Sequence, residues 1–336
     1  MNEHGGNLKD ILMDDDYGGA HAQPSVLHEL NKSNRRLEKL LADLRNEQDA
    51  EGELRTIARS VTTAAELNPD IALACIFLNQ IAGTYAVRHC IETAIVTALV
   101  ARKLHRTQEE LLVLTSAALT MNVGMLRHQN QFNKTSSLNS EEMAIVRRHP
   151  EDSANLLKSA GIDNEEWLSC VLMHHENDDG SGYPEGKTRD DITQNARLLS
   201  LADRYCAQVS ARNYRCSVLP DKALERLLGD PDKVADPVLA DHFIEQIGKY
   251  PPGSLVRMQS NEIGVVIRRV TGGELYIHCL RDAAGKPLRD ANGAPLSVAA
   301  LRRSSDPQCA IVETLSEDDA DVRFSMRQIW GEQASL

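Results

Sequence analysis

Two adjacent histidines, followed by carboxylates and glycines, form the part of this chain whose residue types could do chemistry. The run 174–184 reads His-His-Glu-Asn-Asp-Asp-Gly-Ser-Gly-Tyr-Pro. Neighbouring side chains on a helix point about 100° apart, because one turn takes about 3.6 residues. His174 and His175 could therefore serve two ions, or one ion and one substrate oxygen. The glycines allow positive φ, and Pro184 holds Tyr183 extended at the rim of such a site.

A histidine pair by itself is more often incidental than metal-binding, so the surrounding sequence decides. The run continues to Gly186 as His-His-Glu-x-x-Asp-Gly-Ser-Gly-Tyr-Pro-x-Gly, and other polar segments accompany it in a fixed order. These are His89, His149-Pro150, Ala196-Arg197, Ala202-Asp203 with Tyr205, and Arg212-Asn213-Tyr214-Arg215. From about residue 70 to 250 the chain resembles the HD-GYP family, bacterial phosphodiesterases that hydrolyse cyclic di-GMP.

The resemblance implies a role for each matching position. It implies metal ligands at His89, His149, His174, His175 and Asp203, with Asp203 and His175 also catalytic. It implies phosphate contacts from Arg212 and Arg215, for which a solvated helix face is the other interpretation. The motif loop comprises Asp179, Gly180, Gly182, Tyr183 and Pro184.

One segment departs from the family. Where such domains read His-Asp-x-Gly-Lys, this chain reads Met121-Asn122-Val123-Gly124-Met125. In the family the aspartate bridges two ions, whereas Asn122 offers one neutral carbonyl oxygen. Met121 supplies a soft thioether in place of an imidazole, and Met125 removes a cation that would hold phosphate. We therefore expect a degenerate centre without a bridged pair of ions.

The remaining donors could still hold one ion. Imidazole and carboxylate ligands suit iron, manganese or zinc, and the sequence does not choose among them. We expect at most one divalent ion, with a centre that holds none as the other outcome.

Helix signals indicate how these donors are positioned. Thr107 and Glu110 have capping-box spacing, Pro150 suggests a first helical turn just after His149, and Asn164 precedes two glutamates. Gly161 is a helix stop. Donors carried on separate helices must converge in a bundle. We expect a mostly α fold, an HD-domain helical bundle with an N-terminal helix and a small C-terminal β subdomain.

The N-terminal helix carries an apolar seam at heptad spacing. Leu30, Asn34, Leu37, Leu41 and Leu44 are spaced 4-3-4-3. A polar residue at such a core position can fix register in a dimer, so we slightly favour a dimerising helix. The alternative is a helix packed on its own domain, because the clean pattern is short.

Composition changes along the chain suggest four parts. A polar start at 1–24 is expected to be disordered, 25–66 to form the N-terminal helix, and 67–250 to form the helical domain. From 251 to 336, short β-type runs bounded by glycine and asparagine predict a small sheet, and the Pro251–Arg257 segment resembles the β tail found after HD-GYP domains.

Charge and cysteine content limit the partners and the location. The 336 residues are 42% apolar and carry a formal charge of -12, which argues against DNA or an anionic membrane as a general partner. No signal peptide or long apolar run stands out, and seven cysteines without Cys-x-x-Cys spacing suggest buried reduced thiols. We expect a cytoplasmic protein.

Two functions remain open. The favoured one is a regulatory module that binds cyclic di-GMP, or a diguanylate cyclase partner through the exposed Gly182-Tyr183-Pro184 loop, in a homodimeric assembly. The alternative is a residual phosphodiesterase with one metal ion, which would open the cyclic dinucleotide to a linear one. The residues at 121, 122 and 125 favour the first, and the intact later motifs keep the second open.

Overall fold

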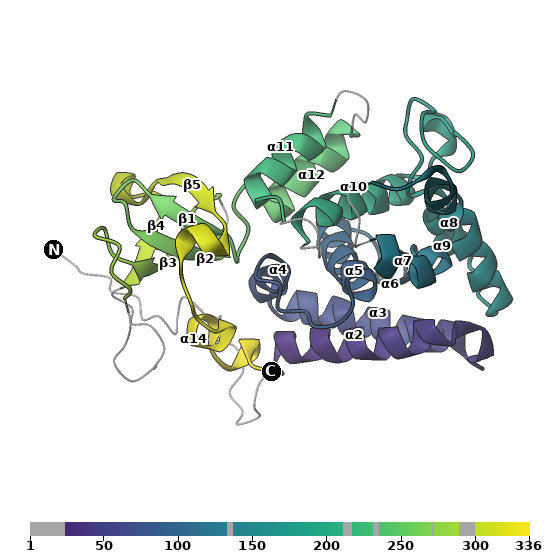
Figure 1. Cartoon of the computed structure of the whole chain (residues 1–336), viewed down its shortest axis with the longest axis horizontal. Helices are drawn as coiled ribbons and strands as arrows, with labels where there is room; N and C mark the ends of the chain where they lie inside the picture. The colour runs from purple at the N-terminus through teal and green to yellow at the C-terminus, as the bar shows by residue number, and fades with distance from the viewer. Residues whose placement is uncertain (1–23, 133–136, 211–216, 231–234, 271, 289–299) are drawn as a thin grey trace.

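A computed structural model describes residues 24–132, 137–210, 217–230, 235–270, 272–288 and 300–336 (Figure 1). The start predicted to be disordered, 1–24, falls almost entirely outside these residues. The longer helices are α2 (Val26–Ala42), α3 (Ala50–Leu67), α4 (Pro69–Phe77), α5 (Tyr85–Lys103), α6 (Gln108–Thr120), α7 (Leu126–Phe132), α8 (Ser140–Ser159), α9 (Glu165–Met173), α10 (Gln194–Val209), α11 (Pro220–Leu228) and α12 (Pro237–Ile247). Short 3-10 turns include η2 (Val123–Met125), between α6 and α7.

Local capping signals set several helix boundaries as predicted. Thr107 and Glu110 form the capping box of α6, in which the Glu110 carboxylate accepts the Thr107 N–H at 2.8 Å. Asn164 accepts the N–H of Trp167 at 2.9 Å and starts α9. Gly161, just after α8, has a φ of 86°, which suits a glycine at a helix end.

The prediction for Pro150 was wrong. Pro150 lies inside α8, and this helix begins at a capping box formed by Asn139 and Glu142, well before His149. The local signal of a proline, which favours first turns, was overridden by a stronger cap upstream. His149 is therefore an interior helical residue.

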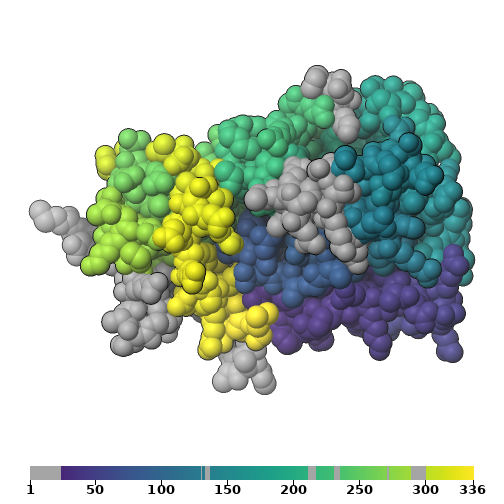
Figure 2. All heavy atoms as spheres, viewed as in Figure 1, coloured from purple at the N-terminus to yellow at the C-terminus, as the bar shows by residue number. Residues whose placement is uncertain are grey.

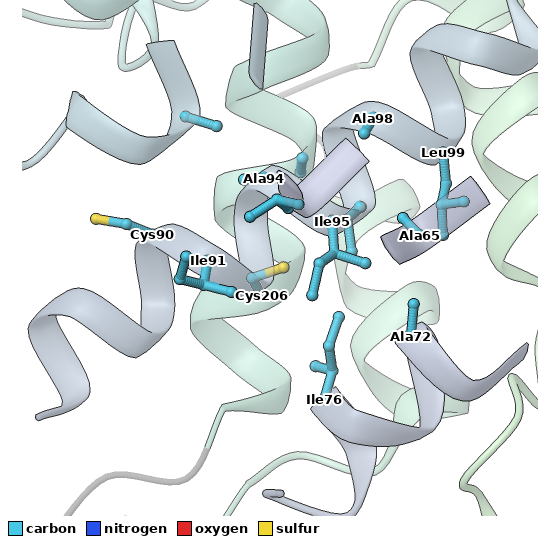
Figure 3. Packing of buried hydrophobic residues seen from close by; sticks show 14 of the residues in the cluster. Ala65, Ala72, Ile76, Cys90, Ile91, Ala94, Ile95, Ala98, Leu99 and Cys206 are labelled. Atoms are coloured by element: carbon cyan, nitrogen blue, oxygen red, sulfur yellow. The ribbon is translucent and has the colours of Figure 1, made fainter. Parts of the chain in front are cut away.

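Helix α5 is the centre of the bundle. It packs against α3, α6, α10 and α12, and all but four of its nineteen residues are buried. Small and aliphatic side chains pack around it, among them Ala65, Ala72, Ile76 and Cys206 (Figure 3). This agrees with the low aromatic content, because an alanine-, leucine- and isoleucine-rich core lets helices approach closely. The six cysteines among the described residues are buried free thiols, as predicted.

The apolar seam of α2 is buried within the chain. Leu30 and Leu37 are fully buried against a core shared with α3, α4 and α5. The Asn34 side chain donates to the carbonyl of Ala82 at 2.6 Å, and Asn31 accepts the Ala82 N–H at 2.9 Å. The seam therefore packs against its own chain, which is the alternative to a dimerising helix. A homodimer stays a prediction, but α2 does not support it.

A small antiparallel sheet follows the helices. Its strands are β1 (Leu255–Met258), β2 (Ile263–Arg269), β3 (Leu275–Arg281), β4 (Leu301–Arg303) and β5 (Ile311–Leu315), in the order β4-β3-β2-β1-β5. One face carries Leu255, Val265 and Ile267 into the main helical core. The other face has a smaller core around Val256 and Ile277. The β subdomain thus shares its larger apolar face with the bundle.

The last residues of the chain pack against helix α2. After α13 (Glu317–Ala320), α14 (Met326–Trp330) leads into a final turn, Gly331–Ala334, that contacts α2 (Figures 1 and 2). The Ser25 hydroxyl hydrogen-bonds with the carbonyl of Ser335 at 2.5 Å. Trp330 is buried and donates its indole N–H to the Ile267 carbonyl at 3.0 Å. We call this segment, 326–335, the C-terminal clasp.

One stretch of helix among the described residues, Gln108–Gln129, is long and apolar enough to cross a membrane by length and composition. In the structure 72% of its most apolar window is buried inside the fold. A buried core helix passes the same test, so this stretch is weak evidence for a membrane span.

Candidate metal centre and adjoining cavity

His149, His174 and His175 form a compact cluster, which we call the three-histidine cluster. One nitrogen from each ring lies within 4.8 Å of the other two. His149 comes from the interior of α8 and His174 stands at the end of α9; both are buried, and their Nε2 atoms are 3.2 Å apart. The rings of His174 and His175 have centroids 4.1 Å apart, so both members of the adjacent pair serve this one cluster.

Backbone carbonyls fix the orientation of the two buried rings. The Nδ1–H of His149 donates to the Val146 carbonyl at 2.6 Å, and that of His174 donates to the Val171 carbonyl at 2.7 Å. Val146 would ordinarily accept the N–H of residue 150, but Pro150 has none. Val171 lies in the last turn of α9, where carbonyls lack a further helical donor. Each ring therefore uses a carbonyl that the backbone leaves available.

This arrangement leaves two lone pairs facing each other. With Nδ1 protonated, the Nε2 atom of a neutral imidazole is an acceptor only. Burial lowers the pKa of His149 to about 3, helped by the nearby His174, and burial also lowers the pKa of His174. Both rings are thus neutral, and each has an Nε2 lone pair that could bind a metal ion.

A single divalent ion fits between these rings. Two imidazole nitrogens that each bound one tetrahedral ion at about 2.0–2.1 Å would be separated by about 3.3–3.4 Å. The observed Nε2–Nε2 distance of 3.2 Å is close to this value. Without a cation or a proton between them, two acceptors at this distance repel each other. The residues present therefore fit a single ion.

The other two predicted ligands form a pair beside the cluster. His89 on α5 and Asp203 on α10 are joined at 2.8 Å between Nε2 and Oδ1. Burial alone would raise the pKa of Asp203, but chiefly the hydrogen bond from His89 holds it well below its usual range. Asp203 is therefore an ionised carboxylate next to the three-histidine cluster, and His89 orients it.

The turn formed by residues 121–125 is held tightly against α8. The Ser153 hydroxyl donates to the Met121 carbonyl at 2.8 Å and accepts the Gly124 N–H at 2.9 Å. A Cβ on Gly124 would lie 2.7 Å from the His149 carbonyl oxygen, so only glycine allows α8 to approach. Packing against α8 is therefore sufficient reason for a glycine at this position.

Asn122 has a buried side-chain oxygen with no hydrogen-bond partner among the described residues. A buried amide oxygen that is left unpaired costs free energy. It carries no formal charge. Met121 is fully buried and Met125 is half-buried on η2.

The three carboxylates of the 174–184 run, Glu176, Asp178 and Asp179, accept hydrogen bonds that hold the loop. The buried Glu176 accepts the backbone N–H groups of Glu185, Gly186 and Lys187 at 2.7, 3.1 and 3.0 Å. Asp178 accepts from Arg197 at 2.9 Å, and Asp179 accepts the Ser181 N–H at 2.9 Å. Sequence reasoning had counted these acids toward the chemistry of the site.

The loop folds back onto the cluster. A Cβ on Gly182 would lie 2.4 Å from the Asn177 nitrogen, so this close return requires glycine. The ring of Tyr183, which precedes Pro184, lies 4.7 Å from that of His175 between centroids. Residues 182–184 are half-buried, so the loop is less exposed than predicted. Its tyrosine faces the site.

A cavity of about 490 Å³ adjoins the cluster. Its walls include His175, Asp203, Tyr183, Asn177 and Gln208, together with the arginines Arg147, Arg204 and Arg226 and the acid Asp230. Sequence reasoning missed these arginines, because none belongs to a recognisable motif. The predicted phosphate ligands Arg212 and Arg215 lie outside the described residues.

The bundle with its histidines and aspartate is that of an HD-type protein, and a family model described as HD domain matches residues 72–239, half of the chain. The chain belongs to the HD domain family. It is 28% identical over 208 residues to the cyclic di-GMP phosphodiesterase PA4108 of Pseudomonas aeruginosa, covering 62% of this chain and 50% of that protein.

Other relatives carry related names. The cyclic di-GMP phosphodiesterase response regulator RpfG of Xanthomonas campestris pv. campestris is 33% identical over 153 residues, with 44% of this chain and 40% of that protein covered. The 3'3'-cGAMP-specific phosphodiesterase 3 of Vibrio cholerae is 31% identical over 142 residues, covering 42% and 30%. The chain spans about half the length, or less, of these curated relatives.

Among solved structures, an HDG"Y"P protein from Bdellovibrio bacteriovorus has a similar fold. Its TM-score is 0.57 at 19% identity, over 69% of this chain and 74% of that chain. At this identity the likeness concerns the fold alone.

Proposed function

We propose that this chain is a cyclic di-GMP signalling protein of the HD-GYP type that holds at most one metal ion and acts mainly by binding the nucleotide or a partner protein. The observation that carries the proposal is the buried, uncharged Asn122 oxygen, unpartnered among the described residues, where the resemblance places a bridging aspartate. The names of the relatives support the nucleotide class.

The three-histidine cluster would hold the single ion. Iron, manganese and zinc all accept imidazole nitrogen, and the cluster does not select among them. When bound, such an ion supplies Lewis acidity toward a phosphate oxygen and lowers the pKa of water. His149 and His174 present neutral nitrogens whose orientation the carbonyls fix. Asp203 contributes a permanent negative charge that His89 holds in place.

A second candidate is a residual phosphodiesterase. It is favoured because His175 and Asp203 both line the open cavity, so a bound phosphodiester would lie against the cluster. The low pKa of Asp203 makes this carboxylate a weak proton acceptor, since burial is outweighed by the hydrogen bond from His89 and the adjacent histidines. In this candidate function Asp203 would act through its negative charge and would not serve as a general base.

A protein partner remains part of the proposal in a narrower form. A diguanylate cyclase that docked on Gly182-Tyr183-Pro184 would meet a half-buried loop whose tyrosine ring lies on His175. Such docking would therefore affect the cavity directly.

The decisive experiment compares the unmodified chain with the Met121→His, Asn122→Asp double variant. Elemental analysis of protein purified without chelator should give at most one ion per chain for the unmodified protein, and more for the variant. Cyclic di-GMP should bind the unmodified chain in calorimetry, with slow or no hydrolysis to the linear dinucleotide.

Two results would contradict this account. Two ions per unmodified chain with rapid turnover would show that Asn122 does not limit the centre. Unchanged metal uptake in the double variant would show that the substituted positions are not the cause. A metal content well below one ion per unmodified chain would remove the phosphodiesterase and leave the binding module.

A further inference from the structure

We infer that Arg147 and Arg226 hold the second phosphate of a dinucleotide whose first phosphate lies at the three-histidine cluster. This inference rests on the proposed function and assigns two residues that no motif identifies. Both line the cavity that also has His175 and Asp203 in its wall.

The two arginines reach the cavity from different helices. Arg147 lies on α8, two residues before His149, and Arg226 lies on α11. Both are exposed residues, whereas Arg204, next to Asp203 on α10, is only partly exposed. The cavity wall therefore combines one partly exposed arginine with two exposed ones.

The charges around the cavity favour an anion. Three arginines face two aspartates, Asp203 and Asp230, in a chain whose formal charge is -12. Within the described part of the chain, neither Arg147 nor Arg226 forms an ion pair with a carboxylate. The neighbouring Arg148, by contrast, is paired with Asp152 at 3.0 Å. Guanidinium groups left available in this way suit bidentate contacts with phosphate.

These arginines also replace a cation that the turn has lost. The position of the family lysine is Met125, and this residue does not line the cavity. The positive charge of the cavity instead comes from α8, α10 and α11.

The size and the aromatic wall favour a dinucleotide. A cavity of about 490 Å³ is within the range of small-molecule sites. The Tyr183 ring lies in its wall, with the Arg147 guanidinium carbon 5.9 Å from the ring centroid. An aromatic ring beside a guanidinium is a surface on which a base can stack. Two phosphates separated by nucleosides would use the cluster and the arginines together.

The test is calorimetry on the full chain with two probes, cyclic di-GMP and GMP. Arg147→Gln and Arg226→Gln should each weaken cyclic di-GMP binding by about tenfold, because each removes a charge-assisted hydrogen bond. GMP has a single phosphate, which would lie at the cluster, so its affinity should change less than about twofold.

Matched controls come from the same helices. Arg148→Gln on α8 and Lys222→Gln on α11 remove the same charge from exposed residues outside the cavity wall. Both should leave cyclic di-GMP affinity unchanged. Equal losses in test and control variants, or equal losses for GMP and cyclic di-GMP, would overturn the assignment.

Failure of this inference is distinguishable from failure of the proposed function. If the unmodified chain binds cyclic di-GMP and both arginine variants bind it equally well, only the assignment of Arg147 and Arg226 is wrong. If the unmodified chain does not bind cyclic di-GMP, both the inference and the nucleotide-binding proposal fall.

Discussion

At the scale of single residues, two unrelated features orient the histidines of the cluster in the same way. A proline inside α8 and the end of α9 each leave a carbonyl without a backbone donor, and a histidine Nδ1–H takes that place. The other ring nitrogen is thereby left as a lone pair that points into the cluster. Pro150 lowers helical stability, but it leaves the Val146 carbonyl available to position His149.

Pro150→Ala should separate stability from metal binding. Alanine restores the N–H that donates to the Val146 carbonyl, so the free energy of unfolding should rise by about 1–2 kcal/mol, some of the gain being offset by lost packing. The same N–H competes with His149, so metal affinity should fall by about 10- to 100-fold. Urea unfolding and competition titration with a chromophoric chelator measure the two effects.

Pro69→Ala serves as the control. Pro69 lies at the start of α4, where a missing N–H costs no helical hydrogen bond. This variant should leave metal affinity unchanged. Wild-type metal affinity in the Pro150 variant would mean that the carbonyl contact does not position His149.

The carboxylates of the 174–184 run illustrate what residue types alone could not tell. Their density predicted chemistry, yet Glu176 accepts three backbone N–H groups and Asp179 closes a turn. A carboxylate has the same composition whether it binds a cation or backbone amides. Only the fold of the loop decides between these roles, and that fold depends on contacts made at a distance in the chain.

At the scale of elements, local sequence signals predicted where helices start, but they did not predict which helices pack together. The caps at Thr107 and Asn164 operate within one turn, so the sequence identified them. The convergence of α8, α9 and α10 on one site came from the family resemblance. Arg147, Arg204 and Arg226 were missed because their meeting depends on the packing of three helices, which no spacing records.

Helix α2 offers a test of the two interpretations of its apolar seam. Asn34→Leu removes the donor to the Ala82 carbonyl, so the free energy of unfolding should fall by about 1–3 kcal/mol. If Asn34 instead fixed the register of a coiled-coil dimer, Asn34→Leu would strengthen the dimer and raise its stability, because leucine favours a coiled-coil core. Urea unfolding and sedimentation velocity together distinguish these outcomes.

Lys32→Leu is the matched control on the exposed face of α2. It should change the free energy of unfolding by less than about 0.5 kcal/mol. If the sedimentation coefficient increased for the Asn34 variant and not for the Lys32 variant, α2 would again be interpreted as a dimerising helix.

At the scale of the whole molecule, the sheet and the bundle share one apolar core. Leu255, Val265 and Ile267 join the helical core from one face of the sheet. Trp330 then packs beside them and donates to the Ile267 carbonyl. We therefore expect the bundle and the sheet to unfold in one transition.

Trp330→Ala should destabilise helices far from it in sequence. Loss of a buried indole costs about 3–5 kcal/mol, and a shared core passes this cost to the bundle. The urea midpoint followed by helical circular dichroism should fall, whereas Leu336→Ala, at a residue 83% exposed, should leave it unchanged. An unchanged helical midpoint in the Trp330 variant would mean that sheet and bundle unfold separately.

The C-terminal clasp has a practical consequence for all these measurements. Ser335 accepts from Ser25, at the cap of α2, so any affinity tag joined after Leu336 begins one residue from this contact. A tag at the other end is separated from Ser25 by the whole segment before it. Purification handles should therefore be attached ahead of residue 1, particularly where metal content is the readout.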